Sequence, residues 1–222
     1  MKTRSMYKAE RMSLDRFPEP VLETILCLLP TKEAARTSIL SREWRYKWTK
    51  IPKLDLYHSM QCASLPSGTK RCKSCYDILQ ILLLRQGPIH ELTLDIPDGK
   101  FLELDRILLH LSRNHPIKKL TLNGWKSFPP WYKLPVSFFS LHHLTDLSIR
   151  YIDLDHPPIF NGFGSLRSLY LRLTEISTKA LLHLLSSCPS LKRLGLVSSP
   201  LNIVLMSWAL YIYIYIYRLG VG

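Results

Sequence analysis

The hydrophobic positions near the start of the chain recur with the spacing of a helix. Between residues 14 and 30 they lie mostly three and four apart, at Val21, Leu22, Ile25, Leu26, Leu28 and Leu29. Such spacing places the side chains on one broad face of an α-helix. Pro20 suits the first turn of this helix, and Pro30 is expected to end it because proline disrupts a helix interior.

Two further short helices are predicted directly after the first. Thr31 suits the N-cap of one, and Ser41 suits the N-cap of the other, in which Trp44 and Trp48 lie on one side. Three such helices within about 40 residues bury too little apolar surface to be stable alone. The density of apolar groups therefore suggests that part of their surface belongs to a partner.

A different pattern, Leu-x-Leu or Leu-x-Ile, recurs in the second half of the chain. Its copies begin at Leu92, Leu120, Leu147, Leu169 and Leu194. The intervals of 28, 27, 22 and 25 residues fall within the range of about 20–29 residues that is typical of leucine-rich repeats. An earlier copy is expected at Leu54, separated from the others by a longer insertion.

Residues two apart in a strand share a face, so each leucine pair is expected to point into a common core that neighbouring repeats bury. Helical patterns at residues 101–114 and 178–189 lie between the strands. This alternation predicts a parallel sheet. The fold class is therefore α+β, with an N-terminal three-helix unit followed by a short α/β solenoid.

The patterns divide the chain into five zones. A tail at residues 1–13 precedes the helical zone at 14–53, and a connector at 54–88 contains the possible first strand. The repeats follow at 89–200, and a low-complexity tail occupies 201–222.

The tail LNIVLMSWALYIYIYIYRLGVG breaks the pattern of repeats. Three interpretations remain open: an exposed β-prone segment, a weak membrane segment of marginal length, or translated non-coding sequence in which alternating codons encode Tyr-Ile repeats. We favour the third, which would make the chain a truncated product, and assign this tail no function.

The composition narrows the range of functions. The formal net charge is +13, which raises the question of a nucleic acid or an acidic partner, and the excess is densest in residues 1–53. The five cysteines are an odd number, and the first twenty residues contain no apolar stretch that could serve as a signal peptide. Both features favour a reducing compartment, the cytoplasm or the nucleus.

Residues 14–56 resemble the plant F-box, in the subgroup that precedes leucine-rich repeats. The resemblance is carried by Phe17-Pro18, Val21-Leu22, Ile25-Leu26, Leu29-Pro30, the segment from Thr37 to Ser41, and Trp44-Arg45 with Trp48. Residues 82–96, 132–149, 157–171 and 186–196 resemble the repeats of the same plant proteins, of the F-box/FBD/LRR type. Phe17 replaces the usual leucine, Glu43 replaces a common basic residue, and the C-terminal part common in the family is missing, as in a truncated member.

The resemblance implies a substrate-recognition subunit of a Skp–cullin–F-box ubiquitin ligase. The F-box would dock on a Skp-family adaptor, and through it on a cullin, while the repeats would hold an unknown protein substrate. The residues expected to contact the adaptor are Pro18, Val21, Leu22, Ile25, Leu26, Leu40, Arg42, Trp44 and Trp48. The apolar members would fill the groove of the adaptor and Arg42 would meet its acidic rim. The alternative is that Ile25, Leu26 and Trp44 are simply core.

The residues that flank the buried leucines must face the concave side of the sheet. Their charges are Glu91, Asp95 and Asp146 against Lys119, Arg150, Arg172 and Arg193. Mixed signs fit a protein partner better than a nucleic acid, which favours a continuous basic lining with stacking aromatics. The predicted substrate contacts are Arg150, Tyr170, Arg172 and Arg193, because Tyr and Arg dominate hot spots. For Glu91, Lys119 and Asp146 we prefer mutual stabilisation across strands.

Nothing in the sequence points to intrinsic catalysis. His58, Cys62, Cys72 and Cys75 could bind zinc, but the family does not imply zinc and a connector loop tolerates stray cysteines. No nucleophile, base and orienting group form a set, so no catalytic residue, metal or cofactor is expected. Three rival hypotheses remain: a non-ligase repeat scaffold, a basic nucleic-acid binder, and a defective truncated product. No membrane partner is expected.

Overall fold

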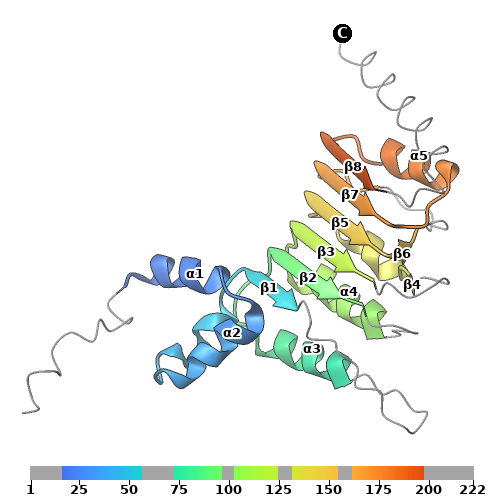
Figure 1. The fold of residues 1–222 in the computed structure, drawn as a ribbon. Helices are drawn as coiled ribbons and strands as arrows, with labels where there is room; N and C mark the ends of the chain where they lie inside the picture. The colour runs from blue at the N-terminus through green and yellow to red at the C-terminus, as the bar shows by residue number, and fades with distance from the viewer. Residues whose placement is uncertain (1–16, 57–72, 97–102, 125–131, 155–161, 198–222) are drawn as a thin grey trace, which may run out of the picture.

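The computed structural model describes residues 17–56, 73–96, 103–124, 132–154 and 162–197. Figure 1 shows a helical unit at the N-terminal end and, beside it, parallel strands stacked along one axis. Helices α3, α4 and α5 lie on one side of the stack and leave the other side as an open face. The molecule is therefore a mixed α and β solenoid with a helical unit at its beginning, which confirms the predicted fold class.

The N-terminal helical unit consists of α1 (Glu19–Cys27), α2 (Thr31–Arg36) and the 3-10 helices η3 (Thr37–Ile39) and η4 (Trp44–Thr49). Pro20 lies in the first turn of α1, as predicted. The predicted role of Thr31 is wrong, because Pro30 occupies the N-cap position of α2. The Thr31 hydroxyl instead accepts a hydrogen bond from the Asp55 backbone N–H at 2.7 Å. Ser41 does accept a hydrogen bond from the Trp44 N–H, at 3.3 Å.

The described residues form a six-stranded parallel sheet in the order β1-β2-β3-β5-β7-β8. The strands are β1 (Lys53–Leu56), β2 (Glu91–Asp95), β3 (Lys119–Asn123), β5 (Asp146–Arg150), β7 (Ser168–Arg172) and β8 (Arg193–Val197). Their first leucines are in register from strand to strand, beginning with Leu54 opposite Leu92. All the predicted copies, including the early one at Leu54, are therefore strands.

Successive repeats are joined in the same way where each strand begins. The carbonyl oxygens of Pro52, His90, Lys118, Thr145 and Arg167 each accept hydrogen bonds from two consecutive N–H groups of the following repeat. The Lys118 carbonyl, for example, accepts from Thr145 at 2.8 Å and from Asp146 at 3.0 Å. This repeated link keeps the strands in register, so flanking residues of each copy lie in rows across the sheet.

Helices α3 (Lys73–Leu84), α4 (Glu103–Asn114) and α5 (Thr178–Ser186) and the 3-10 helix η5 (Val136–Ser140) cover the other side of the sheet, beside a small sheet of β4 (Tyr132–Lys133) and β6 (Ile152–Asp153). The leucine pairs of the strands pack against these segments in one continuous core. Phe138 and Phe163 meet edge to face in this core, with ring centroids 5.6 Å apart. The core therefore leaves the opposite, concave face of the sheet to polar side chains.

Candidate functional site

The residues predicted to contact a Skp-family adaptor fall into two groups in the structure. Leu22, Leu26, Trp44 and Trp48 are buried and form the core of the helical unit together with Ala34 and Ile51. Ile81 of α3 packs against this same core, so the unit is joined to the solenoid by apolar contact. The four buried side chains thus form the core of the unit. For Leu26 and Trp44, core packing is the alternative to adaptor contact that the sequence left open.

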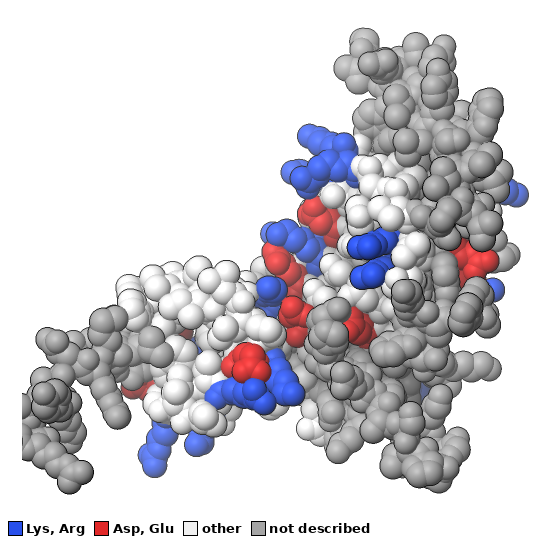
Figure 2. Space-filling model, in the orientation of Figure 1, with Lys and Arg blue, Asp and Glu red and all other residues white. Residues whose placement is uncertain are grey.

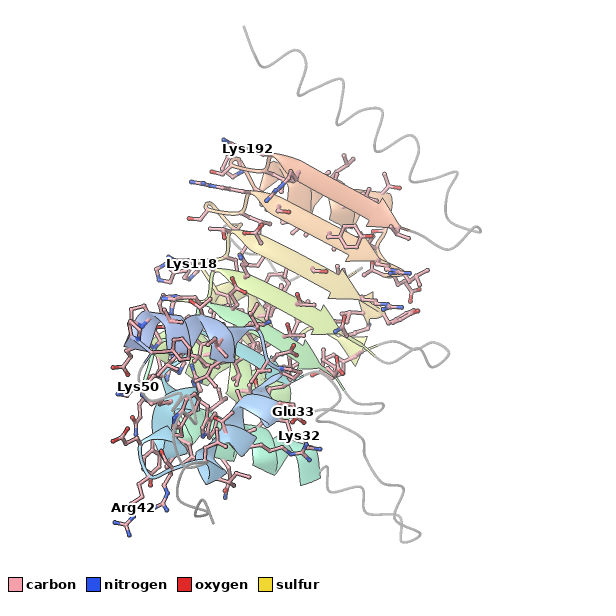
Figure 3. All side chains as sticks on the ribbon, turned by 60° about the vertical axis from the view of Figure 1, so that its left-hand side comes forward. Lys32, Glu33, Arg42, Lys50, Lys118 and Lys192 are labelled. Carbon is pink, nitrogen blue, oxygen red and sulfur yellow. The ribbon has the colours of Figure 1, made fainter. Side chains whose placement is uncertain are left out.

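The second group is exposed and includes Pro18, Val21, Ile25, Leu40 and Arg42. Val21 and Ile25 lie one helical turn apart on α1, on the flank beside the buried Leu22 and Leu26. Figure 2 shows the surface over α1 as largely free of charged side chains. Figure 3 shows Arg42 at an outer end of the helical unit, pointing into solvent. Ile25 is therefore exposed and does not belong to the core of the unit.

Three further apolar side chains are exposed on this unit: Leu28 (78%), Ile39 (87%) and Tyr46 (53%). We use the name apolar face for the set formed by these three side chains together with Val21, Ile25 and Leu40, which lie on or directly after α1, η3 and η4. The helical phase of Leu28, seven residues after Val21, could have identified it from the sequence. Ile39 precedes Leu40 in the same segment, whereas no signal in the sequence distinguishes Tyr46.

A shallow pocket of about 210 Å³ lies between α1 and the end of η4. It is lined by Glu19, Leu22, Glu23, Leu26, Lys47, Lys50 and Ile51. Two acidic and two basic side chains surround its apolar floor, so its charge is balanced. Lys47 also lies over the Trp44 ring, with Nζ 5.9 Å from the ring centroid. The mixed rim suits a protein contact better than a single charged ligand.

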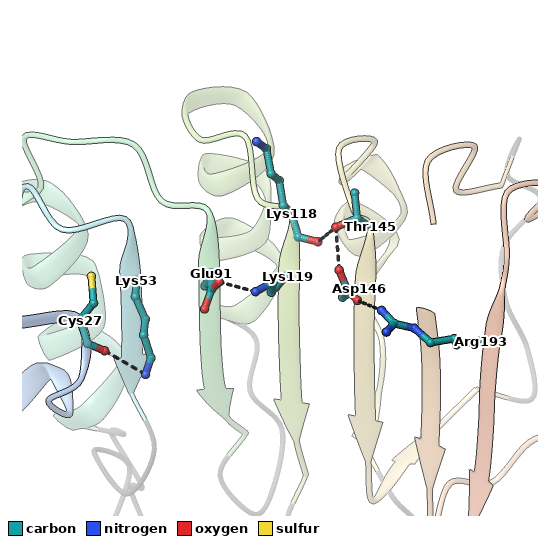
Figure 4. A network of polar contacts seen from close by, with 8 residues as sticks. All are labelled: Cys27, Lys53, Glu91, Lys118, Lys119, Thr145, Asp146 and Arg193. Atoms are coloured by element: carbon teal, nitrogen blue, oxygen red, sulfur yellow. Dashed lines mark hydrogen bonds and ion pairs between the residues drawn. The ribbon is translucent and has the colours of Figure 1, made fainter. Parts of the chain in front are cut away.

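The concave face carries a row of ion pairs at the beginnings of the strands (Figure 4). Lys119 Nζ lies 2.6 Å from a Glu91 oxygen on the neighbouring strand. The hydrogen bond to Glu91 and its negative charge raise the pKa of Lys119. Asp146 accepts a hydrogen bond from the Thr145 hydroxyl at 2.8 Å and pairs with Arg193 at 3.2 Å. Glu91 and Lys119 thus stabilise each other, and Asp146 pairs with Arg193 rather than with Lys119.

The other predicted substrate contacts lie toward the ends of the strands. Arg150 and Arg172 are register partners on β5 and β7. The Arg150 guanidinium carbon is 4.8 Å from the centroid of the Tyr151 ring, and Nη2 donates to the Tyr151 hydroxyl at 3.3 Å. Tyr170 is 41% exposed and faces Gly195, where an ideal Cβ would come within 2.3 Å of its ring. The side chains of Arg150, Tyr170 and Arg172 therefore share one part of the concave face. Arg193 lies at the other end of the strands, where β8 begins.

The proposed zinc ligands fall mostly outside the described residues. His58, Cys62 and Cys72 lie there, and the same holds for the Cys75 side chain. Within the described part of the chain, no group of three or more His, Cys, Asp and Glu side chains could hold a metal ion. In those same segments, no helix has both the length and the apolar character needed to cross a membrane.

Known family models match both the N-terminal helical unit and the repeats. The F-box domain matches residues 14–56. The family described as "FBD-associated F-box protein At5g56370, LRR repeats" matches residues 104–214, which is half of the chain. The chain belongs to the F-box/leucine-rich-repeat family. The N-terminal helical unit is its F-box, and the repeat match extends past residue 200, where the sequence pattern predicts the repeats to end.

Individual relatives come from Arabidopsis thaliana. The F-box/FBD/LRR-repeat protein At1g13570 is 36% identical over 184 residues, which cover 81% of this chain and 42% of the relative. The F-box/FBD/LRR-repeat protein At3g26920 is 28% identical over 195 residues, covering 86% of this chain and 42% of that protein. F-box/LRR-repeat protein 25 is 28% identical over 199 residues, with 87% and 70% covered. The chain therefore spans less than half the length of the first two relatives.

The general roles of F-box proteins are known at the level of the family. F-box domains generally bind Skp-family adaptors, and F-box and leucine-rich-repeat proteins are typically non-catalytic substrate adaptors of Skp–cullin–F-box ubiquitin ligases. No catalytic family is indicated for this chain.

Proposed function

We propose that this protein is a substrate-recognition subunit of a Skp–cullin–F-box ubiquitin ligase. Its F-box would dock on a Skp-family adaptor and its concave sheet would bind a protein substrate. In this role the chain has no catalytic residue of its own. It would raise the local concentration of substrate lysines near the carrier enzyme that is loaded with ubiquitin. This is catalysis by proximity.

The apolar face of the F-box carries this proposal. Six large apolar side chains are exposed on a unit whose buried core already contains Leu22, Leu26, Trp44 and Trp48. Large exposed apolar patches on soluble proteins mark interaction sites. The described contacts of the solenoid with this unit include those of the partly buried Ile81 and of Arg85, neither of which belongs to the apolar face. We therefore infer that a separate polypeptide is the occupant that would bury this face.

Charge supports the same partner. Arg42 is exposed at the outer end of the F-box, and residues 1–53 carry the densest excess of basic side chains in the chain. Complementary charge accelerates association and selects the partner more than it adds affinity. An adaptor with an acidic rim beside an apolar groove would match both features.

Co-expression of the full chain with a Skp-family adaptor tests the proposal. We expect the two proteins to co-purify through size-exclusion chromatography in a 1:1 complex that persists at 0.5 M salt, because the contact is mainly apolar. A chain that is folded by circular dichroism yet never co-purifies with any Skp-family adaptor would contradict the proposal. That result would favour the rival repeat scaffold, in which the helical unit only covers the end of the sheet.

The same proposal places the protein in the cytoplasm, the nucleus or both. Cys27 and Cys188 are free thiols in the described structure, and burial raises the pKa of each. Imaging of the full chain with a fluorescent protein at either end would test this location, and secretion of the fusion would contradict it.

A further inference from the structure

Two arginines occupy paired positions at the ends of neighbouring strands. Arg150 ends β5 and Arg172 ends β7, and the two residues are partners in the parallel register. Adjacent strands lie about 4.8 Å apart, and like charges at such positions repel each other. An anion between the two guanidinium groups would offset this repulsion.

The described residues supply no such anion. Of the other concave-face cations, Lys119 and Arg193 each form an ion pair with a carboxylate of the same face, and Lys53 donates to the Cys27 carbonyl oxygen at 3.2 Å. No ion pair of the described structure involves Arg150 or Arg172. In their register row the neighbours are Asn123 on one side and Val197 on the other. Asp95 lies in the same register row beyond Asn123, whose side-chain amide donates a hydrogen bond to it at 3.0 Å. Glu91 and Asp146 are thus paired with cations, whereas the pair of Arg150 and Arg172 has no carboxylate among the described residues.

Arg150 is held in a fixed orientation. Its guanidinium packs over the Tyr151 ring, and its Nε is buried without a hydrogen-bond partner. Tyr151 has a left-handed backbone, with φ of 54°, and its N–H donates to the Arg172 carbonyl at 3.3 Å. A guanidinium stacked on a ring loses less conformational freedom when it binds a ligand. The pair is therefore preorganised for an incoming acceptor.

Tyr170 adds an aromatic surface beside the pair. It precedes Arg172 by two residues, so both side chains project from the same face of β7. Its ring lies against Gly195, where any side chain would collide with it. Tyrosine and arginine, with tryptophan, are enriched among the hot spots of protein interfaces.

We propose that Arg150, Arg172 and Tyr170 form a site for an acidic peptide segment, in which the oxygens of a carboxylate or a phosphate group bridge the two guanidinium groups. Arginine binds both groups through two parallel hydrogen bonds. A protein segment fits better than a nucleic acid, because the acidic side chains Glu91, Asp95 and Asp146 share the same face. The site deepens the proposed function, on which it rests, by giving the chemical class of the substrate.

Fluorescence anisotropy with the full chain tests the site directly. Three labelled peptides of one sequence carry at their centre two glutamates, two phosphoserines or two glutamines. We expect the glutamate or phosphoserine peptide to bind at least tenfold more tightly than the glutamine peptide, and the stronger of the two identifies the anion. In the double variant Arg150→Gln/Arg172→Gln this preference should fall about tenfold.

The double variant Arg106→Gln/Arg113→Gln is the matched control. It removes the same charge from two exposed positions of α4, on the opposite side of the sheet. We expect it to bind the acidic peptide within about twofold of the unchanged chain. An equal loss in both double variants, no preference for the acidic peptides, or full competition by single-stranded DNA would each overturn the proposal.

Adaptor docking is measured separately on the same proteins. Arg150→Gln/Arg172→Gln should still co-purify with the Skp-family adaptor, because the arginines lie on the sheet and not on the apolar face. Failure of adaptor docking with peptide binding intact would reject the ligase role and keep the site. Loss of peptide preference with docking intact would reject the site alone.

Discussion

Arg85 Nη1 donates a hydrogen bond to the main-chain carbonyl of Trp48 at 2.8 Å. Because Arg85 directly follows α3, this bond joins α3 to the F-box. Its other terminal nitrogen, Nη2, donates to the carbonyl of Ile51. Both carbonyls lie at the C-terminal end of η4, where a cation is favoured. Burial lowers the pKa of Arg85 to about 10, so the side chain remains charged at neutral pH.

Replacing Arg85 with methionine should destabilise the protein while leaving the apolar stem in place. The change leaves two half-buried carbonyls without their donor, and we expect a loss of about 2 kcal/mol in the free energy of unfolding. Urea unfolding followed by tryptophan fluorescence measures it, because Trp44 and Trp48 lie beside the lost contacts. Arg113→Met, at an exposed position of α4, is the control, and equal stability of the two variants would contradict the linking role of Arg85.

The exposed and buried residues of the F-box should separate in mutation experiments. Leu40→Asp should weaken adaptor capture at least tenfold with little change in melting temperature, because Leu40 is 56% exposed. Leu84→Asp on α3, at 52% exposure, is the matched control and should leave capture unchanged. Leu26→Ala should lower stability by about 2–5 kcal/mol, because Leu26 is buried in the F-box core. Similar capture by Leu40→Asp and Leu84→Asp would count against the apolar face.

Two glycines on the sheet should respond differently to alanine. At Gly124 an added Cβ would lie 2.1 Å from the Tyr151 carbonyl oxygen, which is backbone and cannot move without shifting a strand end. At Gly195 the added Cβ would meet the half-exposed ring of Tyr170, which can rotate away. Gly124→Ala should cost about 1–3 kcal/mol, and Gly195→Ala clearly less. Thermal unfolding compares them, and a larger loss at Gly195 would refute this ranking.

Gly195→Ala has a second expected effect. By displacing the Tyr170 ring, it should weaken binding of the acidic peptide several-fold while leaving stability nearly unchanged. The anisotropy measurement described above detects this change.

His115 should make stability depend on pH in the mildly acidic range. Burial, with smaller contributions from His110 and Arg85, lowers the pKa of His115. The unfolded chain then binds a proton near pH 6.5 while the folded chain does not, so stability falls as the pH drops below about 6.5. The Ile89 N–H also donates to Nδ1 of His115 at 3.4 Å, which needs the neutral ring.

Urea unfolding at pH 7.5 and pH 5.5 tests the contribution of His115. The loss of stability between these pH values should be smaller in His115→Gln than in the unchanged protein. His143→Gln, at an exposed position, serves as the control and should keep the full loss. An identical pH dependence in all three proteins would show that His115 does not contribute.

Several features of the fold follow from the sequence alone. The Leu-x-Leu copies predict the strands and their register because a strand repeats every two residues, and only one phase buries both leucines. The copy at Leu54 is recognisable for the same reason. The type of the third helix of the F-box is harder to predict, since periodicity over so few residues does not distinguish an α-helix from a 3-10 helix.

The candidate sites depended more strongly on tertiary structure. The apolar spacing of α1 identifies Val21, Leu22, Ile25 and Leu26 together, but it does not say which pair meets Trp44 and Trp48. Likewise, the flanking residues of the strands show which charges share a face, but not that Arg193 reaches Asp146 across a strand. The sequence predicts Thr31 as a helix cap, whereas in the structure its hydroxyl accepts a hydrogen bond from the Asp55 N–H.

By itself the sequence determined the succession of an F-box and parallel repeats, because local periodicity and chain order are enough to define each element and its buried face. Tertiary structure alone decided which apolar side chains stay exposed and which arginines lack a carboxylate. Both outcomes depend on distances between residues far apart in the chain, and those distances are set only when the helices pack and the strands align.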